Sequence, residues 1–399
     1  MIYLAGIFIT IFLFIVLISK KRKSQADKIL AAWLFFTGLH LVLFYLFVTK
    51  DYTQFPYLLG VEKGLPLVHG PFLFLYTLAL TSAKKVTKVS LLHFIPVVIL
   101  YGLMMPFFLM PPERKIDVYN HQGQGYEWLA VILIPAIMLS GIVYVILSFY
   151  LLRKHKKNIE SQFSDTEKIN LNWLRYLIYG TSVIWIIIIV GLDDDYIYTA
   201  VVVYVFFLGY FGIKQVGVFS NPVLQEDNSI VAKQQLNTET VNEIINPVTS
   251  SEAISLETDH DSNEAIESNE KVKYKKSSLT DEDAEKIHDD LERIMSDEQL
   301  FKDPELTLGE LAQKLSIHPN TLSQVINSFE HKNFYDYINN LRIEEFKRIT
   351  QQPDSKKYTL LSLAFKCGFN SKTAFNRNFK KAVGLSPTEY LSQSEIELG

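Results

Sequence analysis

The chain has 399 residues, of which 48% are hydrophobic, and a formal net charge of −4. The length leaves room for two or three domains, and the hydrophobic content is too high for an ordinary soluble protein of this size. The single cysteine, Cys367, excludes a disulfide framework and a cysteine-based metal cluster within one chain. No cofactor or metal is predicted.

The first 213 residues contain seven apolar runs long enough to cross a membrane. A spanning helix needs roughly 17 to 25 mainly apolar residues to cross a hydrocarbon core of about 30 Å. Cations follow the first run and no small-residue cleavage site is present, so this run indicates a retained span and not a secretory signal. Prolines are expected to kink the fourth and fifth spans. The predicted spans are 2–18, 29–48, 65–82, 89–110, 128–152, 176–192 and 196–213.

Lysine and arginine are distributed unevenly among the loops between these runs. The first, third and fifth loops hold fourteen cations, whereas the second, fourth and sixth hold four. Cation-rich short loops face the cytoplasm. The bias predicts a multi-pass segment with its N-terminus outside and everything after residue 213 in the cytoplasm.

Two histidines, His40 and His69, lie inside predicted spans. Ionisable groups within a membrane are costly and are often functional, so both are possible sensing residues. A neutral histidine bonded to a neighbouring helix is the alternative interpretation.

Residues 214–277 are predicted to be an acidic, disordered cytoplasmic linker. Between residues 225 and 270 there are eleven Asp or Glu against the single cation Lys233, and no helical or strand periodicity is sustained. Such a composition cannot bury enough apolar surface to fold.

A third segment, 278–392, has the pattern of a soluble helical domain. "TDED" (280–283) and "TLGE" (307–310) have the spacing of capping boxes, and Pro319 fits the first turn of a helix. A helix is expected to end at Gly368, with Asn370 or Ser371 as the N-cap of the next one.

An internal repeat divides this segment into two helix-turn-helix units. Leu311-Ala312 and Lys314 match Leu363-Ala364 and Lys366 at an offset of 52, while Leu322 and Ile326 match Phe375 and Phe379 at an offset of 53. A duplicated helix, turn and helix, joined by the amphipathic stretch 333–350, is a much stronger signal than a single match.

The helix predicted after Gly368 has one apolar and one cationic face. At about 100° per residue, one half of its circumference holds Phe375, Phe379, Ala374 and Ala382, and the other holds Lys372, Thr373, Asn376, Arg377, Lys380 and Lys381. Between Ser355 and Thr388 there are seven Lys or Arg and no acid. A merely solvated face would mix both signs, so the pattern favours nucleic-acid binding.

The stretch "LSLAFKCGFNSKTAFNRNFKKAVGLSPTEYL" (361–391) resembles the signature of the AraC/XylS family of bacterial transcription regulators, with its Gly-Phe turn, its Phe-x-x-x-Phe-Lys-Lys helix and its Gly-x-Ser-Pro-x-x-Tyr ending. The resemblance covers about residues 280–392. It implies a seven-helix domain with two helix-turn-helix units and a long linker helix. The recognition helices would enter two adjacent major grooves of double-stranded DNA, about 34 Å apart.

The same resemblance assigns residues to the interface. Arg377 is the best single base reader, whereas Gln324 stands where many members have arginine. The expected phosphate contacts are Thr321, Ser371, Lys380 and Lys381. The expected base contacts are Asn320, Ser323, Gln324, Asn327, Lys372, Thr373, Asn376 and Arg377. Leu311, Leu322, Ile326, Phe369, Phe375, Phe379 and Leu385 are expected in the core.

The predicted fold class is therefore all-α: a seven-helix transmembrane bundle at 1–213, the linker at 214–277 and the double helix-turn-helix domain at 278–392. The leading hypothesis is a non-enzymatic transcriptional regulator of the bacterial inner membrane that couples an envelope or membrane signal to transcription, with an unknown small molecule or envelope component as the signal. Expected partners are operator DNA, the lipid bilayer, RNA polymerase and a second copy in a homodimer. Signalling by dimerisation and signalling by proteolytic release in the linker both remain open.

Two other functional classes compete with this hypothesis. The membrane half could be an enzyme or transporter that uses His40, His69, Glu62 or Glu127, although no HExxH, GxSxG or phosphate-loop motif supports it. The C-terminal domain could instead be a protein adaptor with a degenerate DNA surface.

Overall fold

The structure is a computed structural model, and it describes residues 1–82, 86–121, 123–167, 169, 171–214 and 279–397. The predicted linker, except for its first residue, lies outside the described residues, as do Lys84, Lys85 and Lys168 of the cation-rich loops. The described residues are nearly all helical and form no strand, apart from one isolated antiparallel bridge between Phe163 and Thr307. The all-α prediction is thereby confirmed.

The chain divides into two compact units, and the division does not follow the sequence order. Of the described residues, those up to 156 and from 171 to 214 belong to unit 1, and those from 157 to 169 and from 279 to 397 belong to unit 2. A short segment from the apolar half of the sequence therefore folds with the C-terminal helices, contrary to the predicted division at residues 213 and 278.

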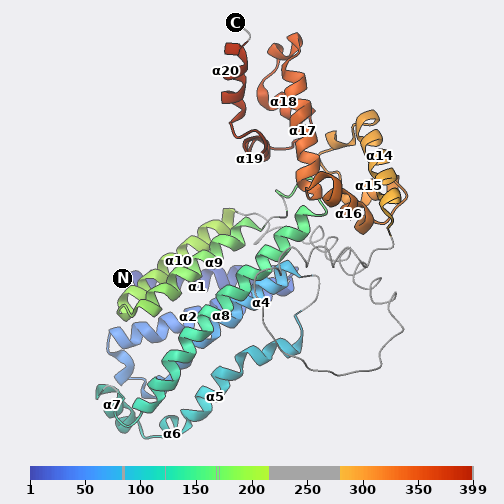
Figure 1. The fold of residues 1–399 in the computed structure, drawn as a ribbon. Helices are drawn as coiled ribbons and strands as arrows, with labels where there is room; N and C mark the ends of the chain where they lie inside the picture. Colours follow the sequence, from blue (N-terminus) through green and yellow to red (C-terminus); the bar gives the residue numbers. More distant parts are fainter. Residues whose placement is uncertain (83–85, 122, 168, 170, 215–278, 398–399) are drawn as a thin grey trace, which may run out of the picture. The chain divides into compact units, whose positions relative to one another are not determined.

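Unit 1 is a bundle of apolar helices (Figure 1). Helix α1 packs on α2 and α10, α2 packs on α4, and α9 packs on α10. Ser24 and Asp27 form a reciprocal capping box that starts α2, because each side chain accepts a hydrogen bond from the other residue's backbone N–H. The helices are α1 (Ile2–Ser19), α2 (Gln25–Val48), α3 (Val61–Gly64), α4 (Pro66–Thr81), α5 (Ile95–Leu103), α6 (Met105–Phe108), α7 (Pro112–Asn120), α8 (Glu127–Glu160), α9 (Asn172–Val190) and α10 (Asp194–Lys214), with 3₁₀ turns at Asp51–Thr53, Pro56–Leu58 and Lys88–Phe94.

Four helices among the described residues have the length and composition to cross a membrane: α1, α2, α8 and α9. A fifth span results if Pro56–Gly64 and Pro66–Thr81, which meet at an angle of 47°, are counted together. The predicted span 89–110 is not one helix but a 3₁₀ turn, α5 and α6, because Pro96 and Pro106 each lie in the first turn of a new short helix. The seventh predicted range corresponds to α10, a helix of 21 residues that is not among these candidate spans, so seven spans are not shown.

Unit 2 is built around the 17-residue helix α17 (Phe334–Thr350), which carries two separate cores. The first half of α17, including Phe334 and Ile338, packs with α14 and the first helix-turn-helix. The second half, including Ile343 and Phe346, packs with the second. The other elements are α14 (Asp281–Asp297), α15 (Leu308–Lys314), α16 (Pro319–Glu330), α18 (Leu360–Lys366), α19 (Lys372–Val383) and α20 (Pro387–Glu397), with 3₁₀ turns at Leu300–Lys302 and Pro353–Lys357.

Most of the predicted helix ends in unit 2 are confirmed. Thr307 and Glu310 form a reciprocal capping box, whereas at Thr280 only the side chain accepts, from the backbone N–H of Asp283. Ser371 is the N-cap of α19, accepting from the N–H of Ala374 at 3.0 Å. Six of the seven predicted core residues are buried, but Leu385 is partly exposed. Burial raises the pKa of the Cys367 thiol to about 12, so at neutral pH it is a small uncharged side chain of the core.

Candidate nucleic-acid interface

The two helix-turn-helix units have the same dimensions. In the first, α15 has 7 residues and α16 has 12; in the second, α18 has 7 and α19 has 12. Both begin with a threonine N-cap, Thr307 and Thr359. The turn between the helices covers residues 315–318 in the first unit and 367–371 in the second, and this extra residue explains why the repeat offset changes from 52 to 53.

The second turn depends on Gly368. Its φ of +98° lies in the left-handed region, and a Cβ added there would lie 2.6 Å from the carbonyl oxygen of Phe301 and 2.9 Å from Nε of Arg342. Both the conformation and the close approach require glycine. This turn sets the direction of α19 relative to α17.

We therefore expect Gly368→Ala to destabilise unit 2 by about 2 kcal/mol or more, through positive-φ strain and the clash with backbone. The measurement is hydrogen exchange of the α18 and α19 amides in the full chain. The matched control is Gly309→Ala in α15, where the nearest atom is 3.9 Å from the added Cβ. That change is expected to leave stability the same or raise it slightly. Equal exchange in the two variants would contradict the role given to the turn.

Helix α19 separates its faces as its sequence predicts. Ala374, Phe375 and Phe379 are buried. The opposite face exposes Lys372, Thr373, Asn376, Arg377, Lys380 and Lys381. Ala382, expected on the apolar side, is exposed, and Asn378 is buried instead, donating to the Tyr335 hydroxyl at 2.8 Å. Asn378 cannot be recognised as a core residue from the sequence, because a polar side chain gives no apolar signal and its partner Tyr335 lies on another helix.

Two cations of this face already have partners. Arg377 donates through Nη2 to the Tyr335 hydroxyl at 2.8 Å, and Lys381 forms an ion pair with Asp336 at 2.6 Å. Burial lowers the pKa of Arg377, but Tyr335 and the carboxylates of Glu167 and Asp165 raise it by more, so the net shift is upward. A ligand bound to this face would therefore compete with Tyr335 and Asp336 for these two side chains.

Helix α16 presents a less cationic face. Leu322, Val325 and Ile326 are buried; Asn320 and Asn327 are exposed, and Thr321, Ser323 and Gln324 are partly exposed. The Asn327 amide donates to the carbonyl oxygen of Ser323 at 2.7 Å, so one of its donors is used within the helix. The predicted contacts of this helix thus lie on one accessible side that carries amides and hydroxyls but no cation.

Arg342 of α17 holds several segments of unit 2 together. It is 1% exposed and donates to the carbonyl oxygens of Phe301 at 2.6 Å and Asp303 at 2.7 Å, and to Oγ of Ser164 at 3.1 Å. Burial lowers its pKa to about 10, and nearby groups including Asp165 limit the shift. It is charged at neutral pH, and its fork of donors satisfies acceptors that no apolar side chain could satisfy.

Ser164 belongs to the loop between α8 and α9, residues 161–171, which we call the α8–α9 loop. This loop lies against unit 2 through backbone bonds from Ser164 N to Leu306 O at 3.2 Å and from Leu308 N to Gln162 O at 2.9 Å. Asn339 of α17 donates to the carbonyl oxygen of Ser164 at 3.0 Å. Ser164 is 1% exposed, so the loop is part of the packed interior of this unit.

The acidic part of the α8–α9 loop lies beside the start of α19. Asp165 accepts a hydrogen bond from the amide of Asn370, next to the N-cap Ser371. Asp165 and Glu167 line a cleft together with Asp303, Glu305 and Ser371. These carboxylates lie near the N-terminus of α19. The N-terminus of a helix favours anions, so here the carboxylates would compete with a DNA phosphate. The two predicted sensing residues, His40 and His69, lie in unit 1 and take no part in this surface.

Comparison with known proteins also finds a helix-turn-helix domain in this region. Residues 311–393 match the family model of a helix-turn-helix domain. The Escherichia coli protein YijO, described as an uncharacterized HTH-type transcriptional regulator, is 33% identical over 93 residues, which are 23% of this chain and 32% of that protein. The HTH-type transcriptional regulator Rv1931c of Mycobacterium tuberculosis is 29% identical over 83 residues, which are 21% of this chain and 31% of that protein.

The chain thus spans about a third of the length of these curated relatives. No solved structure matches the chain. The C-terminal region carries a helix-turn-helix domain of the AraC type and is related to transcriptional regulators, which confirms the resemblance seen in the sequence.

Proposed function

We propose that this protein is a membrane-embedded, sequence-specific regulator of transcription. The observation that carries the proposal is the exposed face of α19, which combines four cations with one amide and one hydroxyl on a helix whose opposite face is buried in a core. This face belongs to a helix-turn-helix domain in a chain that also contains long apolar helices. Such a chain can carry a DNA-binding surface at a membrane.

The proposed assignment of side chains to base contacts and to phosphate contacts follows from their chemistry. Arginine and lysine suit guanine, asparagine and glutamine suit adenine, and cations or helix N-termini suit phosphates. We assign base contacts to Asn320, Ser323, Gln324, Asn327, Lys372, Thr373, Asn376 and Arg377, and phosphate contacts to Thr321, Ser371, Lys380 and Lys381. The lack of cations on α16 supports a stronger contribution from α19 to affinity.

Embedding in a membrane is supported by the outer surface of unit 1. Only 17% of the most apolar stretch of α8 is buried, and Val131, Leu139 and Ile146 are 74%, 63% and 61% exposed. Apolar side chains exposed along a whole helix are stable in lipid and unfavourable in water. The cation-rich loops support an orientation with the N-terminus outside and unit 2 in the cytoplasm.

Coupling between the two units is supported by the α8–α9 loop. The loop joins two apolar helices of the chain. It is also hydrogen-bonded to Arg342 and Asn339 of α17 and to Asn370 beside α19. A movement of α8 or α9 would therefore act on the DNA-binding surface through chain connectivity. A signal can change the DNA-binding surface only if the protein has two conformational states and the signal stabilises one of them more than the other. RNA polymerase and a second copy of the chain remain proposed partners.

Arg377→Ala is expected to cost about 1 to 3 kcal/mol in DNA binding and to relax the base preference at one position. Lys380→Ala should instead weaken all sequences alike and reduce the salt slope by about 1. Both variants are compared by binding of the full chain in phosphatidylcholine nanodiscs to a selected operator and to scrambled DNA. Uniform weakening by Arg377→Ala would contradict its assignment as a base reader.

The proposal as a whole is tested in two steps. Selection from random DNA with the full chain, followed by footprinting, should give two protected major-groove segments about 34 Å apart on one side of the duplex. A reporter that is active only in the cytoplasm should be active when fused after residue 399. DNA protection without a preferred sequence, or a reporter active only outside, would overturn the proposal.

A further inference from the structure

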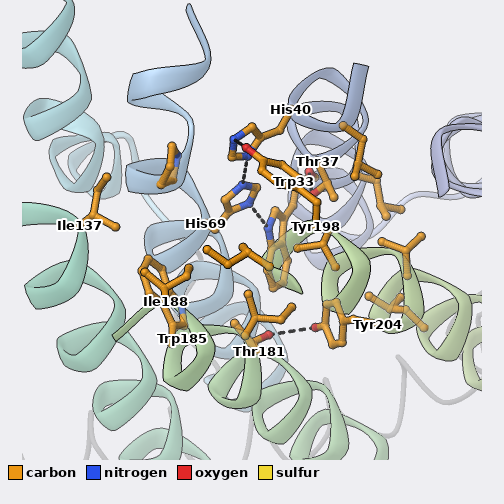
Figure 2. A pocket seen from close by; sticks show the side chains of 18 of the residues that line it. Trp33, Thr37, His40, His69, Ile137, Thr181, Trp185, Ile188, Tyr198 and Tyr204 are labelled. Atoms are coloured by element: carbon orange, nitrogen blue, oxygen red, sulfur yellow. Dashed lines mark hydrogen bonds between the residues drawn. The ribbon is translucent and has the colours of Figure 1, made fainter. Parts of the chain in front are cut away.

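Unit 1 contains a partly open cavity, formed by residues other than those of the proposed DNA-binding surface. Its volume is about 240 Å³, and its walls come from α2, α4, α8, α9 and α10 (Figure 2). Leucine, isoleucine, valine and tryptophan side chains form most of the wall. Small-molecule sites are typically concave, mainly apolar and furnished with a few placed polar groups.

The polar groups form a directed chain of hydrogen bonds. Trp33 Nε1 donates to His69 Nδ1 at 3.1 Å, His69 Nε2 lies 3.2 Å from His40 Nδ1, and His40 Nε2 lies 2.6 Å from the Tyr198 hydroxyl. Figure 2 shows these four side chains meeting at the cavity. They come from α2, α4 and α10.

The direction of every bond in this chain is fixed by Trp33. An indole N–H can only donate, so Nδ1 of His69 carries no proton and its proton is on Nε2. His69 therefore donates to His40, whose own proton is on Nε2 and is donated to the oxygen of Tyr198. Both histidines are neutral in this arrangement. The hydroxyl hydrogen of Tyr198 therefore has no acceptor within this series of hydrogen bonds.

Tyr198 differs in this respect from the other hydroxyl groups of the cavity wall. Thr37 donates to the carbonyl oxygen of Trp33 at 2.9 Å, Thr181 to that of Leu177 at 3.0 Å, and Tyr204 to that of Leu177 at 3.2 Å. Tyr198 has no such acceptor among the described residues. Burying a donor without an acceptor costs about 1 to 3 kcal/mol, so an acceptor on a ligand would be stabilised there.

We propose that this cavity binds a small uncharged lipophilic molecule whose carbonyl oxygen accepts a hydrogen bond from Tyr198. A water molecule takes up about 30 Å³ in the liquid, so a cavity of about 240 Å³ holds roughly eight non-hydrogen atoms. The free polar group is a donor, which selects an acceptor on the ligand. An anion is disfavoured because the carboxylate of Asp194 also lines the cavity and the wall supplies no cation.

This inference deepens the proposed signal coupling and rests on it for its biological meaning, since a ligand here would contact α8, α9 and α10 together. Helices α8 and α9 are the two that the α8–α9 loop connects. Ligand binding can be measured without DNA. A failure of the ligand proposal can therefore be distinguished from a failure of the proposed function.

The test uses the full chain in phosphatidylcholine nanodiscs and tritiated 2-octanone, with empty nanodiscs to subtract partitioning into lipid. We expect saturable binding of one molecule per chain. Unlabelled n-nonane, with the same number of non-hydrogen atoms and no acceptor, should compete about tenfold more weakly than unlabelled 2-octanone, and octanoate should compete no better than nonane.

Tyr198→Phe should weaken 2-octanone binding about tenfold and remove its advantage over nonane. Tyr204→Phe is the matched control, because it removes a hydroxyl from the same wall whose hydrogen is already bonded to Leu177. It should change binding less than twofold. Absence of saturable binding in the unaltered chain, equal competition by nonane, or equal effects of the two tyrosine variants would overturn the proposal. DNA binding by the same nanodisc samples reports separately on the proposed function.

Discussion

Arg342→Met is expected to destabilise unit 2 by about 3 to 5 kcal/mol. The substitution keeps an unbranched side chain of similar length but leaves the carbonyl oxygens of Phe301 and Asp303 and the hydroxyl of Ser164 without their shared donor. Each buried polar group left unsatisfied costs about 1 to 3 kcal/mol, and losses of this size are typical when a buried network is broken. DNA binding should be lost with the fold.

Hydrogen exchange of the α17 and α18 amides in the full chain measures this effect, because it reports the stability of unit 2 separately from that of unit 1. The expected loss corresponds to exchange faster by roughly two to four orders of magnitude. Arg348→Met on the same helix is the matched control: its side chain is 58% exposed and pairs with Glu345, which Lys302 also contacts at 2.6 Å. It should have a much smaller effect. Similar exchange in the two variants would show that Arg342 is not the group that holds the segments together.

The double variant Asp165→Asn, Glu167→Gln is expected to raise the DNA affinity of the full chain about tenfold. Both carboxylates lie near Arg377 and raise its pKa, and Asp165 is bonded beside the N-terminus of α19. Like charges placed against DNA phosphates cost several kcal/mol, and 1.4 kcal/mol is a factor of ten in affinity. The neutral amides keep the shape of the loop, so the effect is electrostatic.

Binding to the selected operator is measured at several salt concentrations with the full chain in nanodiscs. The matched control is Glu344→Gln, Asp354→Asn, which removes two acids of unit 2 that pair with Lys347 and Lys357 and changes the net charge equally. If both double variants raised the affinity alike, net charge would explain the result and the α8–α9 loop would have no special inhibitory role.

Local sequence was sufficient for the parts of the fold that depend on neighbouring residues. The caps at Thr307 and Ser371, the turn at Gly368 and the apolar stripe of α19 each follow from residues within one or two helical turns. Periodicity therefore predicted the duplicated helix-turn-helix. Apolar length alone was less reliable in unit 1, because prolines within an apolar run divide it into short helices, as they do between residues 88 and 108.

By itself, the sequence determined that this protein joins apolar helices to a cationic, duplicated DNA-binding pattern, since composition and periodicity are local properties. Only the tertiary structure decided that the α8–α9 loop belongs with the DNA-binding helices, that Asn378 is a core residue, and that His40, His69 and Tyr198 form one chain of bonds. These features depend on polar partners 29 to 205 residues apart in sequence. A hydrogen bond requires both groups in one place, and no local pattern records where the second group will lie.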